Sequence, residues 1–173
     1  FDTKAALTPP LPTIAILASN QLLRFVNHGV KGDTHSLELD GESWLELPAF
    51  RAPQVAGGRS LQIKGTIRST APSGVIFAHG GNRAGYSVYL EEYHLCFAAC
   101  VNNKRTVVRS SAAITGAASF EANWNSKGEL FLKMNGKLVG KSAVGIIHHE
   151  PGDSIQIGAD MIQPVGNYKT PNH

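Results

Sequence analysis

Two short clusters along this chain combine polar side chains with an aromatic ring. Asn82 and Arg83 follow two glycines and precede Tyr86, and Asn167 and Tyr168 repeat the combination towards the C-terminal end. Amide and guanidinium groups can hydrogen-bond pairs of sugar hydroxyls, and an aromatic ring can pack on the apolar face of a pyranose. These five residues are the candidate ligand-binding set. A plainer interpretation, which the pattern favours for the first cluster, is a glycine-rich turn followed by a half-buried tyrosine.

Paired carboxylates suited to hydrolysis are not evident. Glycoside hydrolysis needs two carboxyl groups about 5–10 Å apart, and residues two apart on a strand share a face. Glu38 and Asp40 have this spacing but end at a turn, and Glu91 and Glu92 are adjacent within another turn. A Gly-x-Ser-x-Gly nucleophile motif is also missing. We therefore predict no catalytic residue.

Histidines do not form a recognisable transition-metal motif. The densest cluster is His148-His149-Glu150. Neighbouring strand residues point to opposite faces, and neither His-Glu-x-x-His nor a spaced Cys/His set is present. A loop before Pro151 explains this cluster better than a metal site.

Cys96 and Cys100 are the only cysteines, and they lie on one predicted strand. At a rise of about 3.3 Å per residue, their Cα atoms are roughly 13 Å apart, too far for a disulfide. We expect two buried free thiols.

The charge pattern argues against nucleic-acid binding and membrane insertion. Net charge is +3, but Lys and Arg are scattered at alternating strand positions or in turns, which is typical of a solvated outer face. The chain has no run of about twenty apolar residues that could form a transmembrane helix. Its 173 residues suit one domain with a substantial core.

Alternating apolar and polar residues, interrupted by Gly, Asn and Pro, predict an antiparallel sandwich with one buried face per sheet. The clearest strand is 60–68, and Asn135-Gly136 predicts a tight hairpin because both residues accept positive φ. A second hairpin is predicted around Gly41-Glu42, between 36–40 and 43–48.

Residues 1–33 differ from the remainder, so we divide the chain into an N-terminal arm (1–33) and a β-sandwich domain (34–173). Pro9-Pro10-Leu11-Pro12 is a stiff extended stretch, after which Thr13 could cap a short helix ending at Asn27-His28-Gly29. An irregular extended arm is equally open.

The order of several motifs resembles concanavalin A-like, laminin-G-type jelly-roll domains, and most of all those appended to secreted bacterial sulfatases and glycan-degrading enzymes. The matching segments are Leu37–Gly41, Trp44–Pro48, Leu61–Arg68, Gly74–Gly81, Gly85–Leu90, Leu132–Lys137 and Ile155–Asp160. The resemblance covers about residues 35–168. The usual closing strand, of Phe-x-Gly-x-Ile-Asp type, does not follow Asp160, so it is either lost or replaced by the N-terminal arm.

This resemblance implies an all-β, two-sheet jelly roll that works outside the cell or in the periplasm. It also implies a possible Ca²⁺ near a loop, with Asp160 as the leading ligand and Asp33 and Asp40 as weaker ones. The plainer role for Asp160 is to cap the following turn. A sulfatase nucleophile of Cys-x-Pro-x-Arg type is missing, so this chain is not the catalytic part of such an enzyme.

The function expected from residues and resemblance together is a non-catalytic recognition or docking module. Its partner would be a carbohydrate or an adjacent domain of a larger, sulfatase-like hydrolase. Two alternatives stay open: a glycoside hydrolase or lyase with atypical acid residues, and a purely structural interaction module.

Overall fold

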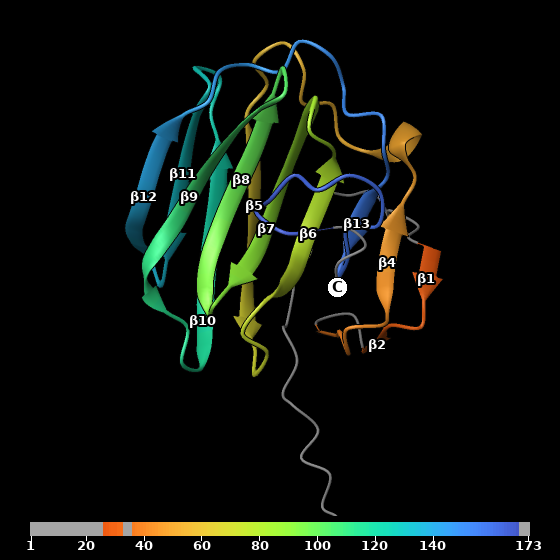
Figure 1. Cartoon of the computed structure of the whole chain (residues 1–173), viewed down its shortest axis with the longest axis vertical. Helices are drawn as coiled ribbons and strands as arrows, with labels where there is room; N and C mark the ends of the chain where they lie inside the picture. The colour runs from red at the N-terminus through yellow and green to blue at the C-terminus, as the bar shows by residue number, and fades with distance from the viewer. Residues whose placement is uncertain (1–25, 33–35, 170–173) are drawn as a thin grey trace, which may run out of the picture.

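The computed structural model describes residues 26–32 and 36–169, which form two stacked antiparallel sheets and a small third one (Figure 1). The seven-stranded sheet has the spatial order β1 (Val26–His28), β4 (Trp44–Leu47), β13 (Ile155–Ile157), β6 (Gly74–Gly80), β7 (Ala84–Glu91), β8 (His94–Val101) and β9 (Lys104–Ala113). The four-stranded sheet has the order β12 (Lys137–Ala143), β11 (Glu129–Met134), β10 (Ala117–Trp124) and β5 (Leu61–Arg68). A short pair consists of β2 (Lys31–Gly32) and β3 (Leu37–Glu38), and the only helical turn among these residues is η1 (Ala49–Arg51).

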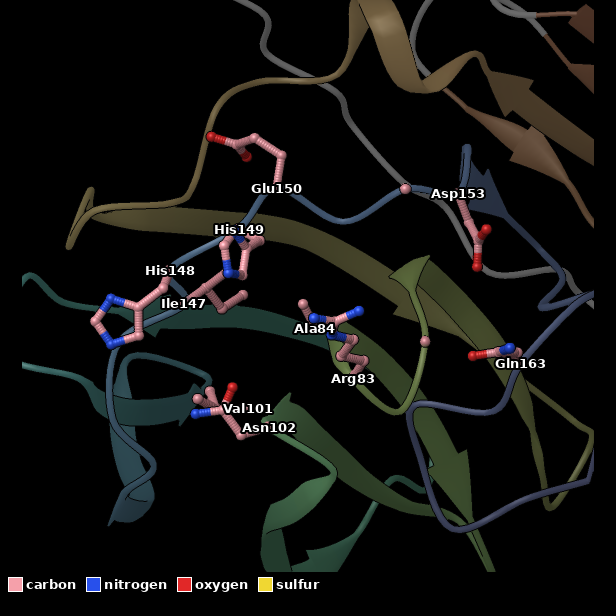
Figure 2. A pocket seen from close by; sticks show the side chains of 12 residues that line it. Arg83, Ala84, Val101, Asn102, Ile147, His148, His149, Glu150, Asp153 and Gln163 are labelled. Atoms are coloured by element: carbon pink, nitrogen blue, oxygen red, sulfur yellow. The ribbon is translucent and has the colours of Figure 1, made fainter.

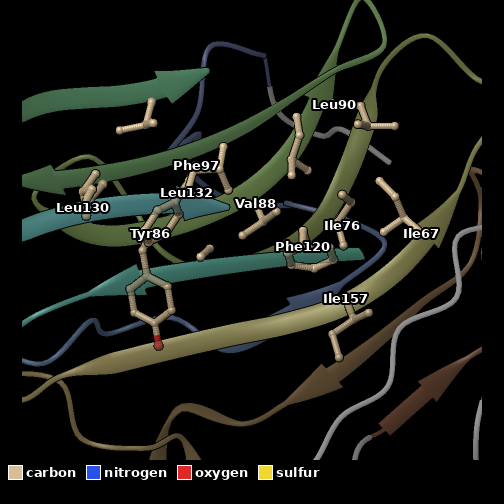
Figure 3. Close-up of a cluster of buried hydrophobic side chains, with 14 of the residues drawn as sticks. Ile67, Ile76, Tyr86, Val88, Leu90, Phe97, Phe120, Leu130, Leu132 and Ile157 are labelled. Carbon is tan, nitrogen blue, oxygen red and sulfur yellow. The ribbon is translucent and has the colours of Figure 1, made fainter. Parts of the chain in front are cut away.

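The core lies between the two large sheets and follows from strand alternation. Ile67, Leu130 and Leu132 of the four-stranded sheet are fully buried and face Val88 and Phe97 of the seven-stranded sheet (Figure 3). Successive strand residues point to opposite faces, so the intervening positions are left at the surface. Each fully buried leucine contributes about 1.5–3 kcal/mol of transfer free energy. The all-β sandwich predicted from the sequence is confirmed.

The central strands β7 and β8 are buried on both faces, which the alternation does not predict. Their outer face is covered by the C-terminal segment, which we define as residues 161–168. Val165 packs there against Tyr89, Cys96 and Cys100. Both cysteines are free and buried, as predicted, and burial raises the pKa of Cys96 to about 11.

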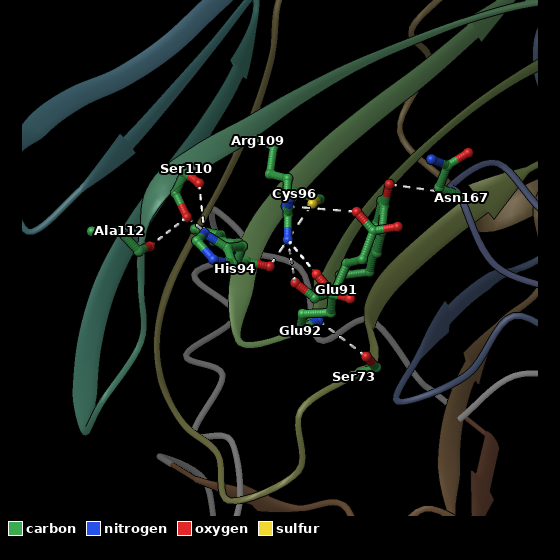
Figure 4. Close-up of polar contacts among 11 residues, drawn as sticks. Ser73, Glu91, Glu92, His94, Cys96, Arg109, Ser110, Ala112 and Asn167 are labelled. Carbon is green, nitrogen blue, oxygen red and sulfur yellow. Dashed lines mark hydrogen bonds and ion pairs between the residues drawn. The ribbon is translucent and has the colours of Figure 1, made fainter.

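Polar contacts fasten this outer face near the β7–β8 turn. The Asn167 backbone N–H donates to the Tyr89 hydroxyl at 3.1 Å, and Arg109 bridges Glu91 and Glu92 (Figure 4). The Arg109 pairs are exposed, so each adds at most about 1 kcal/mol. The seven-stranded sheet is therefore enclosed on both sides at its centre.

One predicted hairpin is confirmed and the other is wrong. Asn135 and Gly136 have φ of 51° and 75° and join β11 to β12, as expected. Around Gly41, however, the Asp40 carboxylate accepts hydrogen bonds from the backbone N–H groups of Glu42 and Ser43. This turn, closed by the Asp40 side chain, connects the small sheet to the seven-stranded sheet. As a result β3 pairs with β2, and β4 lies between β1 and β13.

The predicted N-terminal arm is described only from residue 26 onwards. There, β1 pairs with β4, so Val26–His28 forms the edge of the large sheet. Most of the helix predicted from Thr13 lies outside the described residues, but its predicted end at Asn27-His28-Gly29 is wrong, because Val26–His28 is a strand.

Candidate functional site

An open pocket of about 430 Å³ lies at one rim of the sandwich, where connecting segments meet (Figure 2). The β6–β7 turn contributes Arg83, the β8–β9 turn contributes Asn102, and the segment before β13 contributes His149 and Asp153. Gln163 enters from the C-terminal segment on the side of Asp153. Loops on a rigid sheet scaffold are where recognition residues are commonly found.

The β6–β7 turn is held in a conformation that only glycine permits. The Gly81 N–H donates to the Ala84 carbonyl at 3.1 Å, and the Asn102 N–H donates to the Arg83 carbonyl at 2.8 Å. A Cβ on Gly85 would lie 2.7 Å from the Gly81 backbone nitrogen, so the two arms of the turn are in direct contact. These contacts fix the backbone of Arg83 beside that of Asn102.

The segment before β13 is anchored to the loop after η1. Gly57 donates its N–H to the Ile147 carbonyl, and the Glu150 carboxylate accepts the N–H groups of Val55 and Ala56 at 2.9 and 3.1 Å. Figure 2 shows the Glu150 carboxylate turned towards that loop, whereas Asp153 lies at the other end of the pocket. The two acidic groups of the pocket therefore do not face each other as a catalytic pair would.

Several polar side chains of the pocket remain free for a ligand. Within the part of the chain that the structure describes, the side chains of Arg83, Asn102 and Gln163 make no hydrogen bond or ion pair with another residue. Together they offer a guanidinium group, which donates hydrogen bonds, and two amides, which both donate and accept them. This arrangement suits a ligand rich in hydroxyl groups.

Below the rim lies a buried polar pair that the sequence did not predict. His79 is 1% exposed, and its Nδ1 lies 2.8 Å from the Tyr86 hydroxyl. Burial lowers the pKa of His79 to about 4, although the Glu150 charge and the Asp153 backbone favour protonation. His79 is therefore neutral at pH 7.

The five predicted ligand-binding residues do not gather at one place. Arg83 lines the pocket, and Asn82 is exposed beside it in the same turn. Tyr86 is 0% exposed and packs edge-on against Trp124, so its ring is closed to a ligand in this structure. Asn167 and Tyr168 lie on the outer face of the large sheet, where Tyr168 packs against Tyr89.

Asp160, the predicted calcium ligand, is 3% exposed. Its Oδ2 accepts the Tyr168 hydroxyl at 2.8 Å and the Val165 N–H at 3.4 Å, and burial raises its pKa. These contacts fit the turn-capping role better than a calcium ligand, which would offer its oxygens to the ion. No group of three or more His, Cys, Asp or Glu residues in the described ranges is arranged to hold a metal. Asp40 caps its own turn, and Asp33 lies outside the described residues.

The sequence pattern does not identify Asn102, His149, Asp153 or Gln163 as pocket residues. For the His148-His149-Glu150 cluster, the sequence favoured a loop over a metal site and indicated no pocket. Polar residues follow the ends of predicted strands, which is the one sequence signal that could have pointed to these pocket residues. That signal does not tell which loops meet at one rim.

Comparison with known proteins identifies the fold. No protein-family model matches the sequence, and no curated protein shows significant sequence similarity. Domains LG4-5 of the mouse laminin α1 chain superpose with a TM-score of 0.57 at 21% identity, over 75% of this chain and 34% of that one. A botulinum neurotoxin type C structure gives a TM-score of 0.61 at 17% identity, over 92% and 44%. The receptor-binding domain of a botulinum C/D mosaic toxin gives 0.58 at 13% identity, over 87% and 43%.

The chain therefore has the laminin-G-like, concanavalin A-type jelly-roll fold that the sequence motifs resembled. It spans between about a third and under half of the length of these structures. Among the residues that the structure describes, no helix has the length and hydrophobicity that crossing a membrane requires.

Proposed function

We propose that this chain is a non-catalytic recognition module that binds a carbohydrate in the rim pocket. The observation that carries the proposal is the convergence of three free side chains, Arg83, Asn102 and Gln163, on one open pocket of about 430 Å³. Arg83 would donate to paired hydroxyls, and the two amides would exchange hydrogen bonds with a sugar ring. His149 and Asp153 extend the same rim.

The structural neighbours support a carbohydrate ligand by analogy of fold. The botulinum neurotoxin type C structure is described in terms of an interaction with two ganglioside molecules. At 17% identity this likeness concerns the fold, so the ligand of this chain is argued from its own pocket.

The runner-up, a glycoside hydrolase or lyase, is less well supported. Its two acids would have to flank a bond, one of them as a proton donor. Glu150 is instead fixed by two backbone N–H groups, and it points away from Asp153. The pocket therefore supports binding better than acid–base chemistry.

The proposed setting is a larger secreted protein in which this module accompanies a sulfatase-like or other hydrolase domain. Extracellular or periplasmic localisation belongs to the same proposal. A calcium ion is not required by it, and adding Ca²⁺ or EDTA while recording the melting temperature tests whether one binds.

A glycan array followed by calorimetric titration tests the proposal. Arg83→Ala should weaken the best ligand by about tenfold, the change that follows from losing ~1.4 kcal/mol of interaction. Arg51→Ala is the matched control, because Arg51 stacks over Phe50 outside the pocket and its loss should leave affinity unchanged. If no glycan on the array binds, the carbohydrate proposal is wrong.

A further inference from the structure

The outward face of the four-stranded sheet carries an aromatic ring that the core does not use. Leu130 and Leu132 are both 0% exposed in the core, so Phe131 between them points to the opposite face, where it is half-buried. Its cross-strand partners are polar: Asn123 on β10 and Lys141 on β12. The ring offers a flat apolar surface to a ligand, and Leu138, 54% exposed opposite Lys133, is a further apolar side chain on this face.

A row of polar side chains extends from this ring across the whole sheet. Gln62 on β5 pairs with Asn123, and its Nε2 donates to the Asn123 Oδ1 at 2.9 Å. The row Gln62, Asn123, Phe131, Lys141 thus crosses all four strands and is about 14 Å long at a strand spacing of about 4.8 Å. The Asn123 amide still has N–H groups to donate, and the Gln62 amide still has its oxygen to accept.

The adjacent row is dominated by cations. Lys64, Glu121 and Lys133 are cross-strand neighbours, which places the two lysines about 10 Å apart. The Lys133 Nζ lies 3.4 Å from the Glu121 carboxylate, but both side chains are about 40% exposed, so the pair is weak and Lys133 can turn to another anion. With Arg68 and Lys141, this face has four cations against two carboxylates, Glu121 and Glu129.

We propose that this face binds a linear acidic polysaccharide. Phe131 packs under the apolar side of a sugar ring, and Lys64, Lys133 and Lys141 pair with its carboxylates or sulfates. A shallow groove of about 250 Å³ beside Lys64 adds the hydroxyls of Thr66 and Ser119. The face shares no residue with the rim pocket, so this inference is independent of the proposed function.

Glu121 favours a polysaccharide over a nucleic acid. When Lys133 turns to the ligand, the Glu121 carboxylate needs another hydrogen-bond donor, and sugar hydroxyls supply one. A phosphodiester backbone offers only acceptors to it and would be repelled. The four-stranded sheet, with a polar row about 14 Å long, likewise suits an extended chain of rings.

The test is calorimetric titration of the full chain with heparin and with polygalacturonate at low salt, using dextran as the neutral comparison. Both acidic polymers should bind and weaken as NaCl rises, because salt screens exposed charges, whereas dextran should not bind. Lys64→Ala/Lys133→Ala should weaken heparin about tenfold and Phe131→Ala about fivefold, whereas Phe131→Tyr should bind like the wild type. Lys169→Ala removes one positive charge next to Tyr168, which packs on the opposite side of the molecule, and should change nothing.

Absence of binding to both acidic polymers would overturn the proposal. So would unchanged affinity in the double lysine variant and in Phe131→Ala, each verified as folded by circular dichroism. Tighter binding of oligo(dT) or polyglutamate than of heparin would assign the face to a different class of partner. Arg51→Ala should leave heparin affinity unchanged, because Arg51 lies on η1 and belongs neither to this face nor to the rim pocket.

Discussion

At the scale of single residues, His79 and Tyr86 show that burial can close a side chain to a ligand and leave it a contact inside the protein. The sequence placed Tyr86 at a half-buried strand position with possible ligand contact. In the structure its hydroxyl lies against the imidazole of His79, and the ring is closed to solvent. Alternation can predict which face a residue occupies, but it does not predict that β7 lies in the middle of a sheet covered on both sides. A binding role for Tyr86 therefore could not be settled from the pattern.

The buried imidazole makes stability depend on pH. The folded pKa of His79 is about 4, below its ordinary value near 6.5, so between these values only the unfolded state takes up the proton. The free energy of unfolding should therefore fall by up to about 3 kcal/mol as pH drops from 6.5 to 4. Urea denaturation at several pH values measures this, with His79→Gln expected to lose that part of the dependence. Equal pH dependence in the two proteins would contradict a buried neutral His79.

At the scale of elements, the turns decide which loops meet at the rim. The Asn135-Gly136 hairpin could be predicted because its backbone requirement is local. The Gly41 region could not, because the Asp40 carboxylate closes a turn on itself and the flanking strands pair with partners far along the chain. The pocket depends on the same kind of distant pairing, which explains why Arg83 was predicted and Gln163 was not.

The β6–β7 turn provides an element-scale prediction. A Cβ at position 85 would lie within 2.7–2.8 Å of backbone atoms of His79 and Gly81, which are not free to swing away. Gly85→Ala should therefore cost about 2 kcal/mol of unfolding free energy and displace Arg83. Gly116→Ala is the matched control, because no atom lies within 4 Å of its added Cβ, and it should stay within about 0.5 kcal/mol of the wild type. Urea midpoints equal to the wild type in both variants would show that the turn is not tightly packed.

At the scale of the whole molecule, two facing sheets bury one side of each strand and leave the other for recognition. The sequence predicted this architecture because the alternation in β5, β10 and β11 is regular. It did not predict the double cover of β7 and β8, since the C-terminal segment that provides it has no strand pattern.

Leucines on opposite faces of one hairpin test this architecture. Leu132 is 0% exposed between the sheets, and Leu138 is 54% exposed on the outer face. Leu132→Ala should lower the free energy of unfolding by about 2–5 kcal/mol through the cavity it leaves, and Leu138→Ala should change it by less than about 0.5 kcal/mol. Chemical denaturation gives both values directly. A cost at Leu138 that matches or exceeds the cost at Leu132 would mean that the faces are assigned the wrong way round.

The most direct test of the recognition account is a chemical-shift titration of the ¹⁵N-labelled Lys64→Ala/Lys133→Ala variant with its tightest glycan from the array. This variant weakens binding to the acidic-polysaccharide face by about tenfold, so a response at the rim is easier to separate from one along β10 and β11. The account predicts saturable shifts at the amides of Arg83, Asn102 and Gln163, with little change along β10 and β11. Shifts confined to other surfaces, or no saturable shift with any glycan, would contradict it.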